Sequence, residues 1–187
     1  MPRRTLTAVL LVWLLTPPVF AHELQANRLT LVLRDRNHLT LTFFLTYTDA
    51  LHRALAPART LPEFALVYSA MKPEAFEQEL LRAQAKFQTA TRLTLSAGED
   101  TAITNWTWPE PSRVQATLRE HAMQAIVAPG EHPHEAAVEI RAEATSPQDV
   151  GSVTLRLPEA FQPVLVVSYR PSQVWVEPKT PFTVITV

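Results

Sequence analysis

Apolar and polar residues alternate along two neighbouring stretches near the start of the chain. In residues 28–34 one side carries leucines, and residues 39–47 repeat the alternation after the polar break Asp35-Arg36-Asn37. The apolar positions are Leu29, Leu31, Leu33, Leu39, Leu41, Phe43, Leu45 and Tyr47. A period of two on both sides of a short turn predicts an antiparallel hairpin.

Two stretches have a helical pattern instead. Thr48 and Asp49 can cap a short helix that ends before Pro57. From Pro73 onward, apolar residues recur at spacings of four, three and four, at Phe76, Leu80, Ala83 and Phe87. This spacing predicts an amphipathic helix that covers one face of a sheet.

Short strand-like segments make up most of the remaining chain. They are residues 92–96, 101–108, 136–144, 153–157, 163–169, 174–176 and 181–187. Residues 97–100 can form the turn of a hairpin between the first two of these. Short strands bounded by Pro and Gly predict a mainly β fold, a β-sandwich-like antiparallel core with one or two amphipathic helices.

Two segments leave alternatives open. Residues 112–127 begin with a capping-box pattern at Ser112 and Gln115 but end in MQAIVA, which also suits a strand, and we expect a helix followed by a strand. The apolar tail 181–187 is expected to be the last strand of the sheet. The alternative is a strand offered to a partner by β-augmentation.

The first 21 residues have the layout of a signal peptide. Arg3 and Arg4 precede the apolar run 6–15, two prolines follow it, and a small-residue site ends at Ala21. The alternative, an uncleaved anchor, would need about 20 apolar residues to span a bilayer. We therefore expect cleavage after Ala21, a single β-rich exported domain over residues 22–187 without a transmembrane helix, and a periplasmic location.

Charge and cysteine content exclude several classes of protein. Without Arg3 and Arg4, 15 of the 17 basic residues remain against 18 acidic ones, a net charge of −3 with neutral histidines. Nucleic acid is therefore not an expected partner. Because the chain has no cysteine, it can form neither disulfides nor thiolate metal sites. Stability must come from packing.

The expected cleavage would leave His22 as the first residue, with a free amine and an imidazole on the same residue. These two nitrogens can chelate a metal, and a further imidazole would complete a set of three nitrogen ligands that suits copper. His132 and His134 lie two residues apart in the proline-rich stretch PGEHPHE. We therefore predict a copper site made of His22 with His132 or His134, against the alternative that these histidines are solvated surface residues.

The other candidate residues favour packing or surface roles. His38 is expected at the surface. For His52 and His121 the sequence leaves two roles open, surface residue or ligand. Trp106 and Trp108 lie two apart on a strand, a pattern more typical of packing than of a ligand-stacking platform. The chain lacks G-x-S-x-G, H-E-x-x-H and a phosphate-binding glycine loop. No catalytic residue is predicted.

The stretch Ala21-His22-Glu23-Leu24, followed by the strand 28–34, resembles the extracytoplasmic portion of the hydrogenase/urease accessory (HupE/UreJ) family. By its one histidine the predicted mature terminus is also similar to histidine-brace copper proteins. Together these features favour a periplasmic binding or accessory protein, with copper as its candidate ligand, that acts with a membrane or periplasmic partner. The alternatives are a metal-free structural or interaction module that docks a partner, and an oxidative copper enzyme.

Overall fold

The computed structural model describes residues 27–96, 100–128, 137–161 and 163–171. Its first elements form the predicted hairpin: β1 (Asn27–Arg34) pairs antiparallel with β2 (His38–Leu45). Asp35 and Arg36 adopt positive φ angles of 48° and 64° in the connecting turn, which Asn37 closes by donating its backbone N–H to the carbonyl of Arg34. Two consecutive residues with positive φ match the right-handed twist of a hairpin.

The hairpin lies inside a five-stranded sheet in the order β4-β5-β2-β1-β7. Strands β4 (Ile103–Thr107), β5 (Val138–Thr145) and β2 are joined by antiparallel pairs. Strand β7 (Val164–Tyr169) pairs parallel with β1. Within the described residues, β4 and β7 are therefore the two edges of a mixed sheet.

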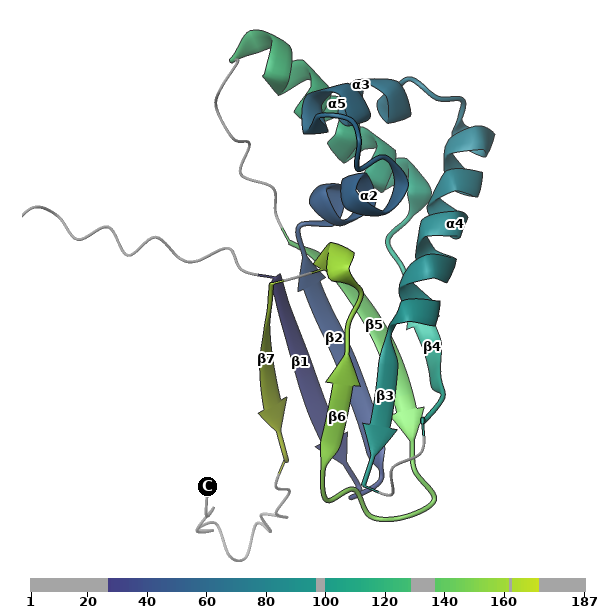
Figure 1. Ribbon diagram of the computed structural model, residues 1–187, viewed down its shortest axis with the longest axis vertical. Helices are drawn as coiled ribbons and strands as arrows, with labels where there is room; N and C mark the ends of the chain where they lie inside the picture. The colour runs from purple at the N-terminus through teal and green to yellow at the C-terminus, as the bar shows by residue number, and fades with distance from the viewer. Residues whose placement is uncertain (1–26, 97–99, 129–136, 162, 172–187) are drawn as a thin grey trace, which may run out of the picture.

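A second sheet of two antiparallel strands, β3 (Arg92–Leu95) and β6 (Val153–Arg156), lies in front of the larger sheet in Figure 1. The core between them takes Leu29, Leu41 and Phe43 from the large sheet and Leu93 from the small one, all fully buried. Phe161, at the end of the 3₁₀ turn η1 (Glu159–Phe161), packs against Phe43 and Phe87 with ring centroids 5.9 and 4.6 Å apart.

Four helices gather at one end of the sheets (Figure 1). They are α2 (Tyr47–Leu55), α3 (Leu61–Ser69), α4 (Pro73–Ala90) and α5 (Pro111–Val127). The predicted apolar face of α4 is confirmed, because Phe76, Leu80, Ala83 and Phe87 are all buried. The small sheet, and not a helix alone, covers the face of the large one (Figure 1).

The mainly β prediction is therefore wrong in its proportions, since the fold is mixed α/β. Helix α3 was missed because its sequence, LPEFALVYS, is apolar without a clear period. Its start is fixed locally, by a capping box in which Thr60 and Glu63 exchange hydrogen bonds.

Two local predictions also fail. Residues 123–127 continue α5 instead of forming a strand, and Ala128 still donates to the carbonyl of Gln124 at 2.8 Å. Glu110 precedes that helix, and Ser112 does not cap it. The predicted hairpin from β3 is confirmed only next to its turn, where Thr94 and Asp100 form an antiparallel bridge and the N–H of Thr101 donates to the carbonyl of Leu93. Strand β4 then pairs with β5 and not with β3.

The other predicted strands that fall in the described residues are confirmed as β5, β6 and β7, and the helix after Leu45 as α2. The segments 1–21, 174–176 and 181–187 lie outside the described residues, so their assignments stay predictions. Among the residues described, none of the helices is both long and apolar enough to cross a membrane.

Candidate functional site

The predicted copper ligands His22, His132 and His134 all lie outside the described residues. The part of the chain that the structure describes contains no group of three or more His, Cys, Asp or Glu residues able to hold a metal ion. The copper site therefore stays a prediction from the sequence.

The three described histidines occupy different surroundings. The imidazole Nε2 of His52 lies 2.7 Å from the carbonyl oxygen of Arg59, and its ring packs on Phe64 with centroids 5.4 Å apart. His121 is buried in α5. His38, which the sequence predicts at the surface, begins β2 and is half-buried. His52 and His121 thus lie within the helical packing, and His38 belongs to a polar cluster on the large sheet.

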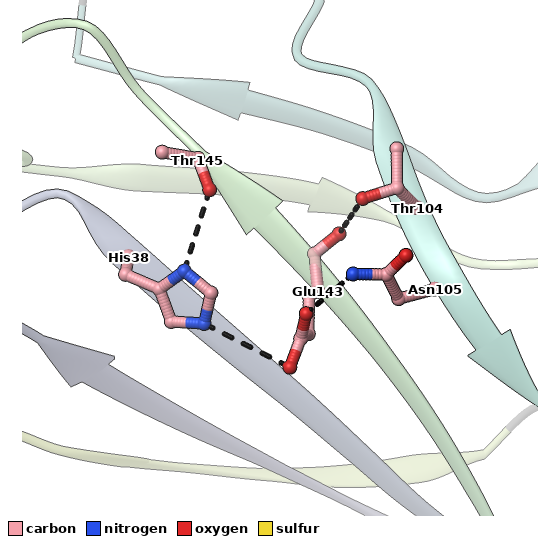
Figure 2. A network of polar contacts seen from close by, with 5 residues as sticks. All are labelled: His38, Thr104, Asn105, Glu143 and Thr145. Atoms are coloured by element: carbon pink, nitrogen blue, oxygen red, sulfur yellow. Dashed lines mark hydrogen bonds and ion pairs between the residues drawn. The ribbon is translucent and has the colours of Figure 1, made fainter.

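That polar cluster joins three strands (Figure 2). The ring of His38 lies 3.3 Å from the hydroxyl of Thr145 and 3.9 Å from a carboxylate oxygen of Glu143. Asn105 donates to the other oxygen of Glu143 at 2.7 Å, and Thr104 donates to the Glu143 carbonyl at 3.4 Å. Asn105 has a φ of 53° and occupies an irregularity in the β4–β5 register, so the cluster secures a bulge.

The cluster has the residue types of a hydroxyl–imidazole–carboxylate relay but not its geometry. The 3.9 Å between His38 Nε2 and Glu143 exceeds hydrogen-bond length, so the carboxylate does not orient the ring as a general base requires. Glu143 is instead fixed by Asn105. We assign these contacts to sheet register.

The opposite edge of the sheet has a different character. Leu165, Val166 and Tyr169 of β7 are 58%, 46% and 56% exposed. In the parallel register Leu165 lies beside Arg28, and Tyr169 lies beside Val32. Leu165 and Tyr169 lie on the outer face of the sheet and Val166 on its inner face, so this edge strand exposes large apolar side chains on both faces, as surfaces suited to contact with another molecule do. We call Leu165, Val166, Val167 and Tyr169, with the free edge of β7, the β7 edge.

Positive charge flanks the β7 edge at both ends. Arg28 stands beside Leu165, and its guanidinium carbon lies 4.5 Å from the centre of the Phe44 ring. Arg170 follows directly after β7 and donates one hydrogen bond to the carbonyl of Val150 at 3.1 Å. Neither arginine forms an ion pair within the described residues. Both guanidinium groups retain donors that can bind carboxylates.

The two tryptophans beside β5 take part in packing. Trp106 stacks on Phe43 and on Trp108 at 5.9 and 5.3 Å, and Trp108 contacts Phe87 and Tyr47. These contacts agree with the packing role that the sequence favours for Trp106 and Trp108.

The same cluster contains two buried polar atoms, Tyr47 Oη and Trp108 Nε1, that have no hydrogen-bond partner within the described residues. Burial raises the pKa of the Tyr47 hydroxyl well above its ordinary value, and the Gln84 side chain, which lies nearby but does not meet hydrogen-bond geometry, offsets only part of that rise.

Comparisons with known proteins found no match: no family model, no curated protein and no solved structure matches the chain. The resemblance to HupE/UreJ proteins, the likeness to histidine-brace proteins and the periplasmic location therefore stay predictions from the sequence. The candidate site rests on the β7 edge alone. Reasoning from the sequence found this strand but not its position, since the run PVLVVSY is as compatible with a central strand as with an edge.

Proposed function

We propose that the chain is an exported binding or accessory module that docks a partner protein by strand addition along the β7 edge. The observation that carries this proposal is the free side of β7 within the described residues, together with the exposure of Leu165, Val166 and Tyr169. An unpaired strand edge offers a row of backbone N–H and C=O groups to a second extended chain. Main-chain pairing would supply affinity, and the apolar side chains would select the partner.

The chemistry of the edge defines the partner segment. Next to Leu165 and Tyr169, an added strand would place apolar side chains at alternate positions. Arg28 and Arg170 at the two ends favour carboxylates at the corresponding ends of that strand. The partner is therefore an extended polypeptide segment, apolar at alternate positions and acidic at its ends.

Site-specific photocrosslinking tests this proposal. A photoreactive amino acid in place of Leu165 should give a discrete adduct with one protein in cells that export the chain. The same group in place of Leu81 on α4, which is 56% exposed, is the matched control and should give none. An adduct from Leu81 but not from Leu165 would overturn the proposal.

A second candidate function is copper binding through His22, favoured by the sequence Ala21-His22 at the expected cleavage site. His22 would supply its amine and imidazole, and His132 or His134 the third nitrogen. Mass spectrometry of the exported protein establishes whether His22 is the first residue. Copper titration then compares this form with one that carries an extra alanine before His22. Equal affinity of the two forms would contradict an N-terminal chelate.

A further inference from the structure

A cleft lies between β7 and the segment that leads into β6. Val166 and Ser168 lie on the same face of the large sheet as Leu29 and Leu31, because they are their partners in the parallel register. Leu29 and Leu31 are buried, whereas Val166 and Ser168 are exposed. The inner face of β7 is thus left open and forms one side of the cleft, which residues 150–153 border on the other.

The deeper part of the cleft is mainly apolar. It has a volume of about 420 Å³, and its lining includes the aliphatic side chains of Leu31, Leu33, Leu39, Val150, Val153 and Val166, with Tyr169 beside them. Ligand pockets in proteins have volumes of roughly 300–1,000 Å³. This part is therefore large enough to take a small apolar group.

The wider mouth, about 910 Å³, is positively charged. Arg34, Arg36 and Arg170 line it together with Asp35 and Asp149, so three cations stand against two anions. Arg36 lies 3.6 Å from Asp149, but both side chains are largely exposed and such a pair is weak. Leu33, Val150, Gly151 and Arg170 line both parts, so the charged mouth and the apolar floor are continuous.

The floor suits a hydrocarbon chain better than a polypeptide. Strand β1 is paired on both sides, with β2 and with β7, so its backbone N–H and C=O groups are already bonded. A peptide backbone placed over β1 would find no backbone partner there, at a cost of roughly 1–3 kcal/mol for each unsatisfied group, and only the edge of β6 that β3 does not pair could offer one. An acyl chain has no polar groups to satisfy.

We propose that the cleft binds a single-chain lipid anion, with its acyl chain over Leu33 and Val166 and its carboxylate or phosphate head at Arg34 and Arg36. Guanidinium groups bind both kinds of head by paired hydrogen bonds. This function shares Val166, Tyr169 and Arg170 with the proposed docking surface, but its ligand is an amphiphile that lies on the inner face of β7 and not a strand paired with its edge.

Calorimetric titration of the full-length protein with monomeric amphiphiles tests the proposal. Dodecanoate carries a carboxylate head and dodecyl phosphate a phosphate head. The amphiphile that binds more tightly identifies the head group of the natural ligand. Dodecyltrimethylammonium has the same tail with a cationic head, whereas acetate and inorganic phosphate are heads without tails. We expect at least one of the two anionic amphiphiles to bind at least tenfold more tightly than any of these three.

Matched variants then locate the site. Val166→Asp places a charge on the apolar floor and should weaken binding at least tenfold. Leu165→Asp places the same charge on the outer face of the same strand and should leave the affinity unchanged. The double variant Arg34→Gln/Arg36→Gln should remove the preference for an anionic head. Thermal unfolding of each variant separates lost binding from lost fold.

Binding of the cationic amphiphile as tight as that of the anionic ones, or no binding of any, would overturn the proposal. Equal affinity of the Val166→Asp and Leu165→Asp variants would do the same, because the ligand would then not lie on the inner face of β7.

Discussion

Val166 and Leu29 are partners in the parallel pairing of β7 with β1, yet Val166 is 46% exposed and Leu29 is fully buried. The two side chains are both aliphatic and lie on the same face of the sheet. Their difference comes from position: the helices and the small sheet cover β1 but leave β7 at the border. This border is the region to which we assign binding.

Substitutions on the outer face of β7 should reduce docking without reducing stability. In the variant Leu165→Lys/Tyr169→Ser, two exposed apolar side chains are lost from the proposed partner surface. We expect the free energy of unfolding to change by no more than about 0.5 kcal/mol, as is usual for surface sites. With the photoreactive group at Val167, the yield of partner adduct should fall at least tenfold. Leu81→Lys on α4 is the control and should leave the yield unchanged.

Phe161 should be one of the most costly residues to truncate, because it is fully buried between Phe43 and Phe87. Phe161→Ala should lower the free energy of unfolding by about 3–5 kcal/mol in a urea titration. Phe44, half-buried on the other face of β2, provides the comparison, and Phe44→Ala should cost only about 1 kcal/mol. Equal losses would show that the two faces do not differ as described.

Removing the buried hydroxyl of Tyr47 should not destabilise the protein, because that hydroxyl has no hydrogen-bond partner within the described residues. A buried group left unsatisfied costs roughly 1–3 kcal/mol. Tyr47→Phe should therefore leave the free energy of unfolding at neutral pH unchanged or raise it by up to about 1 kcal/mol. A clear loss would show that the hydroxyl is bonded.

The same residue predicts a pH dependence. Burial raises the pKa of Tyr47 above the value near 10 that tyrosine has in an unfolded chain. Ionisation therefore favours the unfolded state, and stability present below about pH 10 is lost as the pH rises further. Urea unfolding at pH 8 and at about pH 10.5 should show a smaller loss for Tyr47→Phe than for the wild type.

The capping box at the start of α3 makes a further prediction. Thr60→Ala removes the side-chain acceptor for the Glu63 N–H and should cost about 1 kcal/mol of stability. Hydrogen bonds from Thr60, first from its backbone, hold the pKa of Glu63 below its usual range. That contribution exists above the unfolded pKa of Glu63 and is lost as the pH falls through the folded one. Because Thr60→Ala keeps the backbone N–H that contributes most, most of this pH dependence should remain in that variant, whereas Glu63→Gln should abolish it in urea unfolding at pH 7 and below pH 4.

Patterns with a strong period predicted the elements correctly. The alternation around Leu31 and Leu41 predicted the antiparallel hairpin, and the spacing from Phe76 to Phe87 predicted the buried face of α4. These elements are amphipathic, so their sequences record which side faces the core. The sequences of helix α3 and of the end of α5 do not show which side is buried, since Leu66, Val67, Ile126 and Val127 are apolar and yet exposed.

The pairing of strands could not be read from the chain. Ser96 has a φ of 40° and its hydroxyl accepts the N–H of Gly151 at 2.6 Å, a contact between residues 55 positions apart that helps to hold the β3 end beside β6. Nothing local to residues 92–108 distinguishes this arrangement from a simple hairpin. For the same reason the sequence could not reveal that β7 is an edge, or that Arg170 meets Arg34 and Arg36 at the cleft.

Amide hydrogen exchange of the protein with and without its crosslink-identified partner tests strand addition most directly. If a partner strand pairs with β7, exchange of the amides in residues 164–169 should slow in the complex, while the central strand β2 stays unchanged. Unchanged exchange in β7, or slowing confined to the helices α3 and α5, would contradict the account.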